Sequence, residues 1–196
     1  MDLCLIARGT SEPGPLGVVC GDPLFARIQR ELPGVKVLGY PVQVRRSNLS
    51  IRVQSTNRLQ YSASIAGANV GVADVVKRVN SQMRACPKSK FVLGGYSQGG
   101  MVTIQALSKL PKEARDKTVA VVLYGAGDGS GVNAAFKQKT IANCAPGDFA
   151  CPKSGKGRGH VSYNDKGTIW HDRAAKYVAA AYNGKTQGLK LMRSPK

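Results

Sequence analysis

The sequence is short of histidine, of aromatic residues and of long apolar runs, and each shortage excludes a class of function. Only two of the 196 residues are histidine. Cys144 and Cys151 lie close together in the sequence, as pairs of zinc ligands do. Too few other His or Cys residues lie near them to complete a zinc shell, so we expect no metal site and no cofactor. Aromatic residues make up 6% of the chain and seldom lie among the Lys and Arg residues, which argues against a stacking platform for single-stranded nucleic acid.

No apolar run is long enough to cross a membrane, so no transmembrane segment is expected. The start of the chain also lacks the basic region, apolar centre and small-residue cleavage site of a secretory signal. We interpret the chain as mature, truncated at its start or intracellular. Its length suits one well-buried domain, and we see no internal repeat or linker that would divide it.

Acidic residues are also few. The chain has 11 Asp and Glu residues and 29 Lys and Arg residues, which gives a formal net charge of +18. A charge of this size attracts phosphate, anionic membranes and acidic polysaccharides. Residues 44–59 and 184–196 carry much of it, and their removal would leave the expected core untouched. We therefore favour a cationic soluble surface and expect no nucleic-acid partner.

Short apolar runs alternate with segments of helical periodicity. We expect strands at residues 3–7, 35–42, 91–96, 119–125 and 139–144, and helices at 25–32, 65–83 and 170–182, with a further helix directly after Ser97. This alternation predicts right-handed crossovers and a mostly parallel sheet with helices on both faces. The expected fold class is therefore α/β.

The strand expected at 91–96 runs into Gly95-Tyr96-Ser97-Gln98-Gly99, which matches the pattern Gly-x-Ser-x-Gly. In a nucleophile elbow, this pattern turns sharply from a strand into a helix and lifts the serine to the edge of the sheet. Residues 101–107 continue with helical spacing, as an elbow requires. We predict that Ser97 is a catalytic nucleophile.

A serine hydroxyl is a poor nucleophile at neutral pH and needs a base, which an acidic residue holds in place. The candidates for the base are His160, in a flexible glycine-rich loop after the last expected strand, and His171, which opens the final helix. The chain order nucleophile, acid, histidine, with the histidine on a late loop, favours His160. His171 is then expected to pack at the start of its helix.

The acid should follow a strand after the nucleophile and precede the base, and both Asp128 and Asp148 meet this condition. Cys144 and Cys151 bracket Asp148 at a spacing that suits a local disulfide, which would imply an oxidising compartment. A loop closed in this way would fix a carboxylate, so Asp148 is preferred. Three cysteines have no partner assigned from the sequence: Cys4, Cys20 and Cys86.

The negative oxygen that forms during ester hydrolysis needs hydrogen-bond donors. In an elbow architecture, one donor is the backbone N–H that follows the nucleophile, which belongs here to Gln98. A second donor comes from a loop after an early strand, and the turn at residues 8–11 lies in that place. We expect Thr10, in this turn, to add its hydroxyl.

Together these residues resemble the cutinase family of serine esterases. Four segments carry the resemblance, at residues 7–12, 94–100, 144–151 and 159–163, within a span of roughly 3–182. It implies a small α/β-hydrolase without a large lid, in three layers around a central five-stranded parallel sheet. It also implies that Ser97 is the nucleophile, His160 the base and Asp148 the orienting acid, with Gln98 and Thr10 as oxyanion donors.

The sequence departs from the family pattern at several places. We interpret residues 1–182 as one domain in which 44–60 is an insertion or an untrimmed intron, and 183–196 as a flexible basic tail. The usual partner of Cys86, a cysteine just before the first strand, is missing. The loop before His160 carries Lys153, Ser154, Lys156 and Arg158, where the family often has apolar residues. This change makes short acyl groups or anionic polymers more plausible substrates than long waxy chains.

The leading hypothesis is a secreted, monomeric serine esterase that hydrolyses cutin-type polyesters or short-to-medium acyl esters through an acyl-enzyme. Extracellular localisation is what the resemblance implies. The alternatives are an acetylxylan esterase of the same family and a non-catalytic cationic protein that binds anionic surfaces on the same scaffold.

Overall fold

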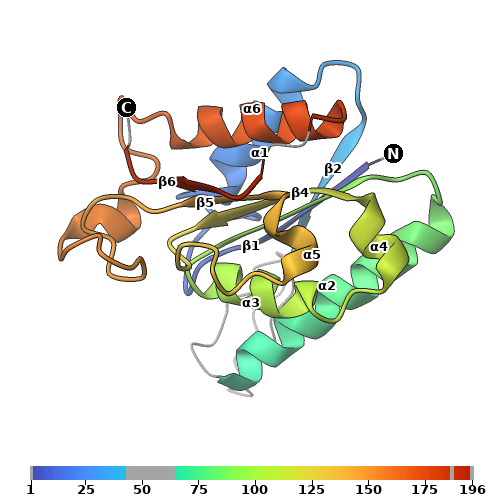
Figure 1. Ribbon diagram of the computed structural model, residues 1–196, viewed down its shortest axis with the longest axis horizontal. Coiled ribbons are helices and arrows are strands. Elements are labelled where there is room, and N and C mark those ends of the chain that lie inside the picture. Colours follow the sequence, from blue (N-terminus) through green and yellow to red (C-terminus); the bar gives the residue numbers. More distant parts are fainter. Residues whose placement is uncertain (1, 43–64, 186–187, 195–196) are drawn as a thin grey trace, which may run out of the picture.

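The computed structural model describes residues 2–42, 65–185 and 188–194 (Figure 1). The expected insertion at 44–60 lies outside the described residues. The strands form one parallel sheet in the order β2-β1-β3-β4-β5-β6. Their bounds are β1 Asp2–Ala7, β2 Val37–Pro41, β3 Phe91–Tyr96, β4 Thr118–Tyr124, β5 Thr140–Asn143 and β6 Lys190–Met192.

Helices cover both faces of the sheet, so the molecule has three layers (Figure 1). On one face lie α1, Gly21–Glu31, and α6, Trp170–Tyr182. On the other face lie α2 Ile65–Ala85, α3 Gln98–Leu107, α4 Lys112–Lys117 and α5 Ala134–Lys137. A short 3₁₀ helix, η1, spans Arg158–Val161. No helix in the described part of the chain is long and apolar enough to cross a membrane.

The central strands are apolar along their whole length because each face of the sheet is buried under helices. In β1, Leu3, Leu5 and Ala7 pack with α2 and α3, while Cys4 and Ile6 pack with α1 and α6. Alternate residues of a strand point to opposite faces, which accounts for this division. The predicted parallel α/β architecture is confirmed.

The expected count of five strands is wrong, because the sheet has six. The sixth strand, β6, lies within the stretch 183–196 that was expected to be a flexible tail. It pairs in parallel with β5, and the Cys144 N–H donates to the Met192 carbonyl at 2.8 Å. Pairing satisfies backbone groups that the edge of β5 would otherwise leave open. A strand of three residues is too short to show a sequence period.

The structure also refines the expected helices. The first begins at Gly21 rather than at residue 25, whereas the last spans Trp170–Tyr182 as predicted. The segment of His160, expected to be a flexible loop, is the 3₁₀ helix η1. Two short helices, α4 and α5, were not predicted from the sequence.

Candidate active site

Three polar side chains meet at the carboxyl edge of the sheet. Ser97 follows β3, Asp148 follows β5, and His160 lies in η1. The strands are parallel, so the loops after them gather at one edge, where open α/β sheets place their ligand sites. Residues that are 63 positions apart in the sequence are thereby brought into contact.

Ser97 sits in a strained turn between β3 and α3. Its φ of 53° and ψ of −124° lie outside the regions that side chains prefer. The turn depends on Gly99, because a Cβ at that position would lie 2.0 Å from the carbonyl oxygen of Ala7 in β1. Helix α3 can therefore begin directly against the sheet with the serine side chain at the edge, as the Gly-x-Ser-x-Gly pattern predicts.

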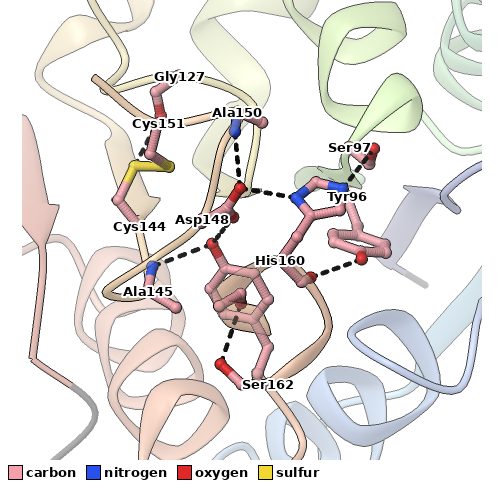
Figure 2. Close-up of polar contacts among 12 residues, drawn as sticks. Tyr96, Ser97, Gly127, Cys144, Ala145, Asp148, Ala150, Cys151, His160 and Ser162 are labelled. Carbon is pink, nitrogen blue, oxygen red and sulfur yellow. Dashed lines mark hydrogen bonds and ion pairs between the residues drawn. A yellow bond between two sulfur atoms is a disulfide. The ribbon is translucent and has the colours of Figure 1, made fainter. Parts of the chain in front are cut away.

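Hydrogen bonds join the three side chains in a row (Figure 2). Nε2 of His160 lies 2.9 Å from Oγ of Ser97, and Nδ1 of His160 lies 2.7 Å from Oδ1 of Asp148. When Nδ1–H donates to the carboxylate, Nε2 has its lone pair directed at the serine hydroxyl. This arrangement fits a Ser-His-Asp triad.

The carboxylate of Asp148 is fully buried and held by three donors. Besides His160, the backbone N–H of Ala150 donates to Oδ1 at 2.8 Å (Figure 2). The hydroxyl of Tyr163 donates to Oδ2 at 2.5 Å. Burial by itself raises the pKa of Asp148, but hydrogen bonds from His160, Tyr163 and Ala150 outweigh it, and the pKa is lowered. The group therefore stays charged at neutral pH.

Tyr163 is the residue of this site that sequence reasoning missed. Its side chain is fully buried, and its hydroxyl also accepts from the N–H of Ala145 at 3.1 Å. Burial, reinforced by the carboxylate of Asp148, raises the pKa of Tyr163, so the hydroxyl keeps its proton for donation. Tyr163 lies three residues after His160, but nothing in one sequence indicates that its side chain turns toward Asp148.

The other candidates for the acid and the base, Asp128 and His171, lie outside this row of hydrogen bonds. Asp128 is near the surface and accepts from the N–H of Ser130 at 3.0 Å. His171 is buried beside the hydroxyl of Tyr124, at 3.0 Å from Nδ1. Burial and the charge of Arg27 lower the pKa of His171 to about 4, so the ring is neutral at neutral pH.

A disulfide joins Cys144 and Cys151 across the Asp148 loop, as the spacing predicted. Cys4 and Cys20 are buried thiols, and Cys86 is half-buried. Burial raises the pKa of Cys4 to about 12, which makes it a poor nucleophile at neutral pH. In the described ranges, no group of three or more His, Cys, Asp and Glu side chains could hold a metal ion.

A cavity of about 520 Å³ opens beside Ser97. Its lining residues are Thr10, Ser97, Gln98, Met101, Gly125, Ala126, Gly127, Phe149 and Ala150. The hydroxyl of Thr10 donates to Oε1 of Gln98 at 2.8 Å, which brings both expected oxyanion donors to one wall. Gln98 is also the first residue of α3, so this wall carries the positive end of a helix dipole.

Comparison with known proteins places this chain in a family. The model of the cutinase family matches residues 3–182. The chain belongs to the cutinase family. This result confirms the resemblance carried by the four sequence segments.

Two curated proteins and one solved structure illustrate how similar this cutinase-family chain is to known proteins. It is 34% identical over 152 residues to Cutinase cut1 of Trichoderma harzianum, over 75% of this chain and 54% of that protein. It is 30% identical over 187 residues to Carboxylesterase Culp1 of Mycobacterium tuberculosis, over 89% of this chain and 78% of that protein. The Trichoderma reesei cutinase in complex with a phosphonate inhibitor superposes with a TM-score of 0.66 at 29% identity, covering 92% of this chain and 75% of that one. This chain spans about half the length of the Trichoderma harzianum cutinase that it matches.

Proposed function

We propose that this protein is a serine carboxylic ester hydrolase in which Ser97, His160 and Asp148 are the catalytic residues. The observation that carries the proposal is the row of hydrogen bonds, 2.9 Å and 2.7 Å long, that ends beside the cavity. The relatives named cutinase and carboxylesterase support the same reaction class.

In the first half-reaction, Oγ of Ser97 attacks the ester carbonyl carbon while its proton passes to Nε2 of His160. The carbonyl oxygen becomes negative and accepts hydrogen bonds from the backbone N–H of Gln98 and from the hydroxyl of Thr10, whose proton turns away from Oε1 of Gln98. The tetrahedral intermediate then collapses. The bond to the alcohol oxygen breaks, that oxygen takes the proton from His160, and an acyl-Ser97 remains.

In the second half-reaction, a water molecule gives a proton to His160 and its oxygen adds to the acyl carbon. The bond to Oγ of Ser97 breaks, and the proton returns from His160 to the serine. The products are a free carboxylic acid and the resting enzyme. Asp148 stays ionised throughout and stabilises the imidazolium in each half-reaction, in keeping with its lowered pKa.

The lining of the cavity supports a proposal for the substrate class. Met101 and Phe149 give it apolar walls that suit an acyl chain, and we propose cutin-type polyesters or short-to-medium acyl esters as substrates. The disulfide supports an oxidising environment, so we propose that the protein acts outside the cell.

The test is hydrolysis of p-nitrophenyl esters, from acetate to palmitate, by the protein and by Ser97→Ala. Loss of the nucleophile should lower kcat by at least about 10⁴-fold. Ser108→Ala, at the exposed end of α3, is the matched control and should keep full activity. A folded protein with no turnover that depends on Ser97 would contradict the proposal.

A further inference from the structure

A strongly cationic segment adjoins the site and has no role in the proposed reaction. Residues 152–158, here called the cationic loop, carry Lys153, Lys156 and Arg158, all exposed. Between Asp148 and Asp165 the sequence has no acidic residue. None of the three basic side chains forms an ion pair with another described residue. Their charge is therefore available to an external partner.

The cationic loop is fixed beside the catalytic row rather than loosely attached. The disulfide at Cys151 precedes it, and the guanidinium of Arg193 donates to the carbonyl of Pro152 at 2.8 Å. The N–H of Gly147 donates to the carbonyl of Ser154, which ties the loop to the Asp148 turn. Its far end enters η1, the helix of His160. The cationic loop thus runs from the disulfide beside Asp148 to the helix of His160.

Three exposed apolar side chains lie near the catalytic row, and we call them the apolar rim: Met101, 56% exposed, Phe149, 73% exposed, and Val161, the residue after His160, 52% exposed. Met101 and Phe149 line the cavity, and the ring of Phe149 lies 4.3 Å from that of His160. Single exposed apolar residues are ordinary on a protein surface. Here they adjoin the catalytic row and the cationic loop together.

Basic residues around exposed apolar side chains form the pattern with which proteins bind anionic lipid surfaces: the charges contact headgroups and the apolar residues enter the interface. We infer that the cationic loop and the apolar rim dock the cavity mouth onto an anionic lipid surface, so that the ester substrate is presented in such a surface. This inference rests on the proposed esterase function. A hydrated acidic polysaccharide would satisfy the charges but would leave the apolar rim in water, so the lipid is the better partner.

The expected effect is large enough to measure. Each basic side chain near an anionic leaflet strengthens binding about fivefold, so the three together contribute about 100-fold. The triple variant Lys153→Gln, Lys156→Gln, Arg158→Gln should lose this factor. Glutamine removes the charge and leaves a polar, though shorter, side chain at each position.

The matched control removes the same charge from the opposite edge of the sheet. Lys36, Lys88 and Lys137 are exposed and precede β2, β3 and β5 at their amino ends. Their replacement by glutamine changes the net charge equally. Screening limits their influence at the cavity mouth, because the Debye length is about 8 Å at physiological salt.

Binding is measured by sedimentation with vesicles of phosphatidylcholine, with and without phosphatidylglycerol, on proteins that also carry Ser97→Ala so that no lipid is hydrolysed. We expect tight binding only to vesicles with phosphatidylglycerol, a loss of about 100-fold in the loop variant, and less than about threefold in the control variant. Equal losses in both variants, or equal binding to both vesicle types, would overturn the inference. Loop-dependent binding to polygalacturonate as tight as to the anionic vesicles would also overturn it, in favour of a polysaccharide partner.

Hydrolysis of dissolved p-nitrophenyl butyrate separates this inference from the proposed function. The loop variant with Ser97 intact should retain full activity on this substrate, since none of the three side chains lines the cavity. It should lose activity on the same ester carried in anionic vesicles. Absence of Ser97-dependent turnover in solution would refute the esterase itself, whereas equal activity of both variants on vesicles would refute only the docking surface.

Discussion

Replacement of Tyr163 by phenylalanine removes one oxygen from the interior of the site and tests whether the hydrogen bond from Tyr163 to Asp148 controls the reaction. The hydroxyl of Tyr163 has one proton and lies 2.5 Å from Oδ2 of Asp148 and 3.0 Å from the carbonyl of Asn143. The shorter contact is to a charged acceptor, so the hydroxyl donates its hydrogen bond to the carboxylate of Asp148 rather than to the carbonyl of Asn143. Phenylalanine would leave Oδ2 and the N–H of Ala145 without this partner.

A hydrogen bond to a charged group contributes about 1.5–3 kcal/mol, which corresponds to about 10- to 100-fold in rate if all of it acts in the transition state. Asp148 keeps its bonds to His160 and Ala150, so we expect kcat to fall toward the lower limit, about 10-fold. Loss of a donor also raises the pKa of Asp148. The pKa of Asp148 is lowered in the parent protein, so its charged form persists as the pH falls. In the variant, the carboxylate would take up its proton at a higher pH than in the parent. The acidic limb of the kcat/KM profile should therefore move to higher pH.

The assay is p-nitrophenyl butyrate hydrolysis across pH, with circular dichroism to verify folding. Tyr124→Phe is the matched control, because it also removes a buried hydroxyl, which lies 3.0 Å from Nδ1 of His171 and does not contact Asp148. Both variants should lose about 1–3 kcal/mol of unfolding free energy. Only Tyr163→Phe should move the acidic limb. An unchanged limb and a kcat within twofold of the parent would show that Tyr163 is structural only.

Three further changes test other parts of the site. Gly125→Ala would place a Cβ 2.6 Å from Oδ2 of Asp148 at a φ of +52°, and kcat should fall at least about 10-fold, whereas Gly34→Ala, at a φ of +81° with open space around its Cβ and outside the cavity, should lose stability only. Thr10→Val should lower kcat by about 10- to 10³-fold with little change in KM, and an unaltered kcat would exclude its hydroxyl as an oxyanion donor. The cysteines of the disulfide are seven positions apart, and its reduction should lower the unfolding free energy by about 2–3 kcal/mol in chemical denaturation, with a parallel loss of activity. Activity that survives verified reduction would contradict the role of this loop in fixing the carboxylate of Asp148.

Most of the sheet could be predicted because its strands are buried on both faces and appear as unbroken apolar runs. Phe91–Tyr96 and Thr118–Tyr124 are such strands, and the chain turns directly after each of them. The strand at Lys190–Met192 could not be predicted, since its first two residues are exposed and only the edge of β5 gives it a partner. Pairing at a sheet edge is a tertiary property that a short segment does not encode alone.

The residues of the candidate site also divide into those that the sequence predicts and one that only the structure reveals. Ser97 and Asp148 stand in local patterns whose geometry is fixed within a few residues, an elbow and a loop bracketed by cysteines. His160 could be selected because the chain has few histidines and because of its chain order. Tyr163 required the structure, because its contact with Asp148 depends on how η1 lies against the Asp148 loop.

The three members of the row come from separate loops, so the site needs backbone anchors to keep its distances. Ser97 is held by the turn from β3 into α3, whose strain the surrounding packing must support. Asp148 is held by the disulfide, and the backbone of His160 by its carbonyl, which accepts from the hydroxyl of Tyr96 at 2.6 Å. Tyr96 is the residue before Ser97, so one turn fixes the nucleophile through the main chain and the base through a side chain. This coupling explains how a 3₁₀ helix among glycines can hold the histidine within hydrogen-bond reach of the serine.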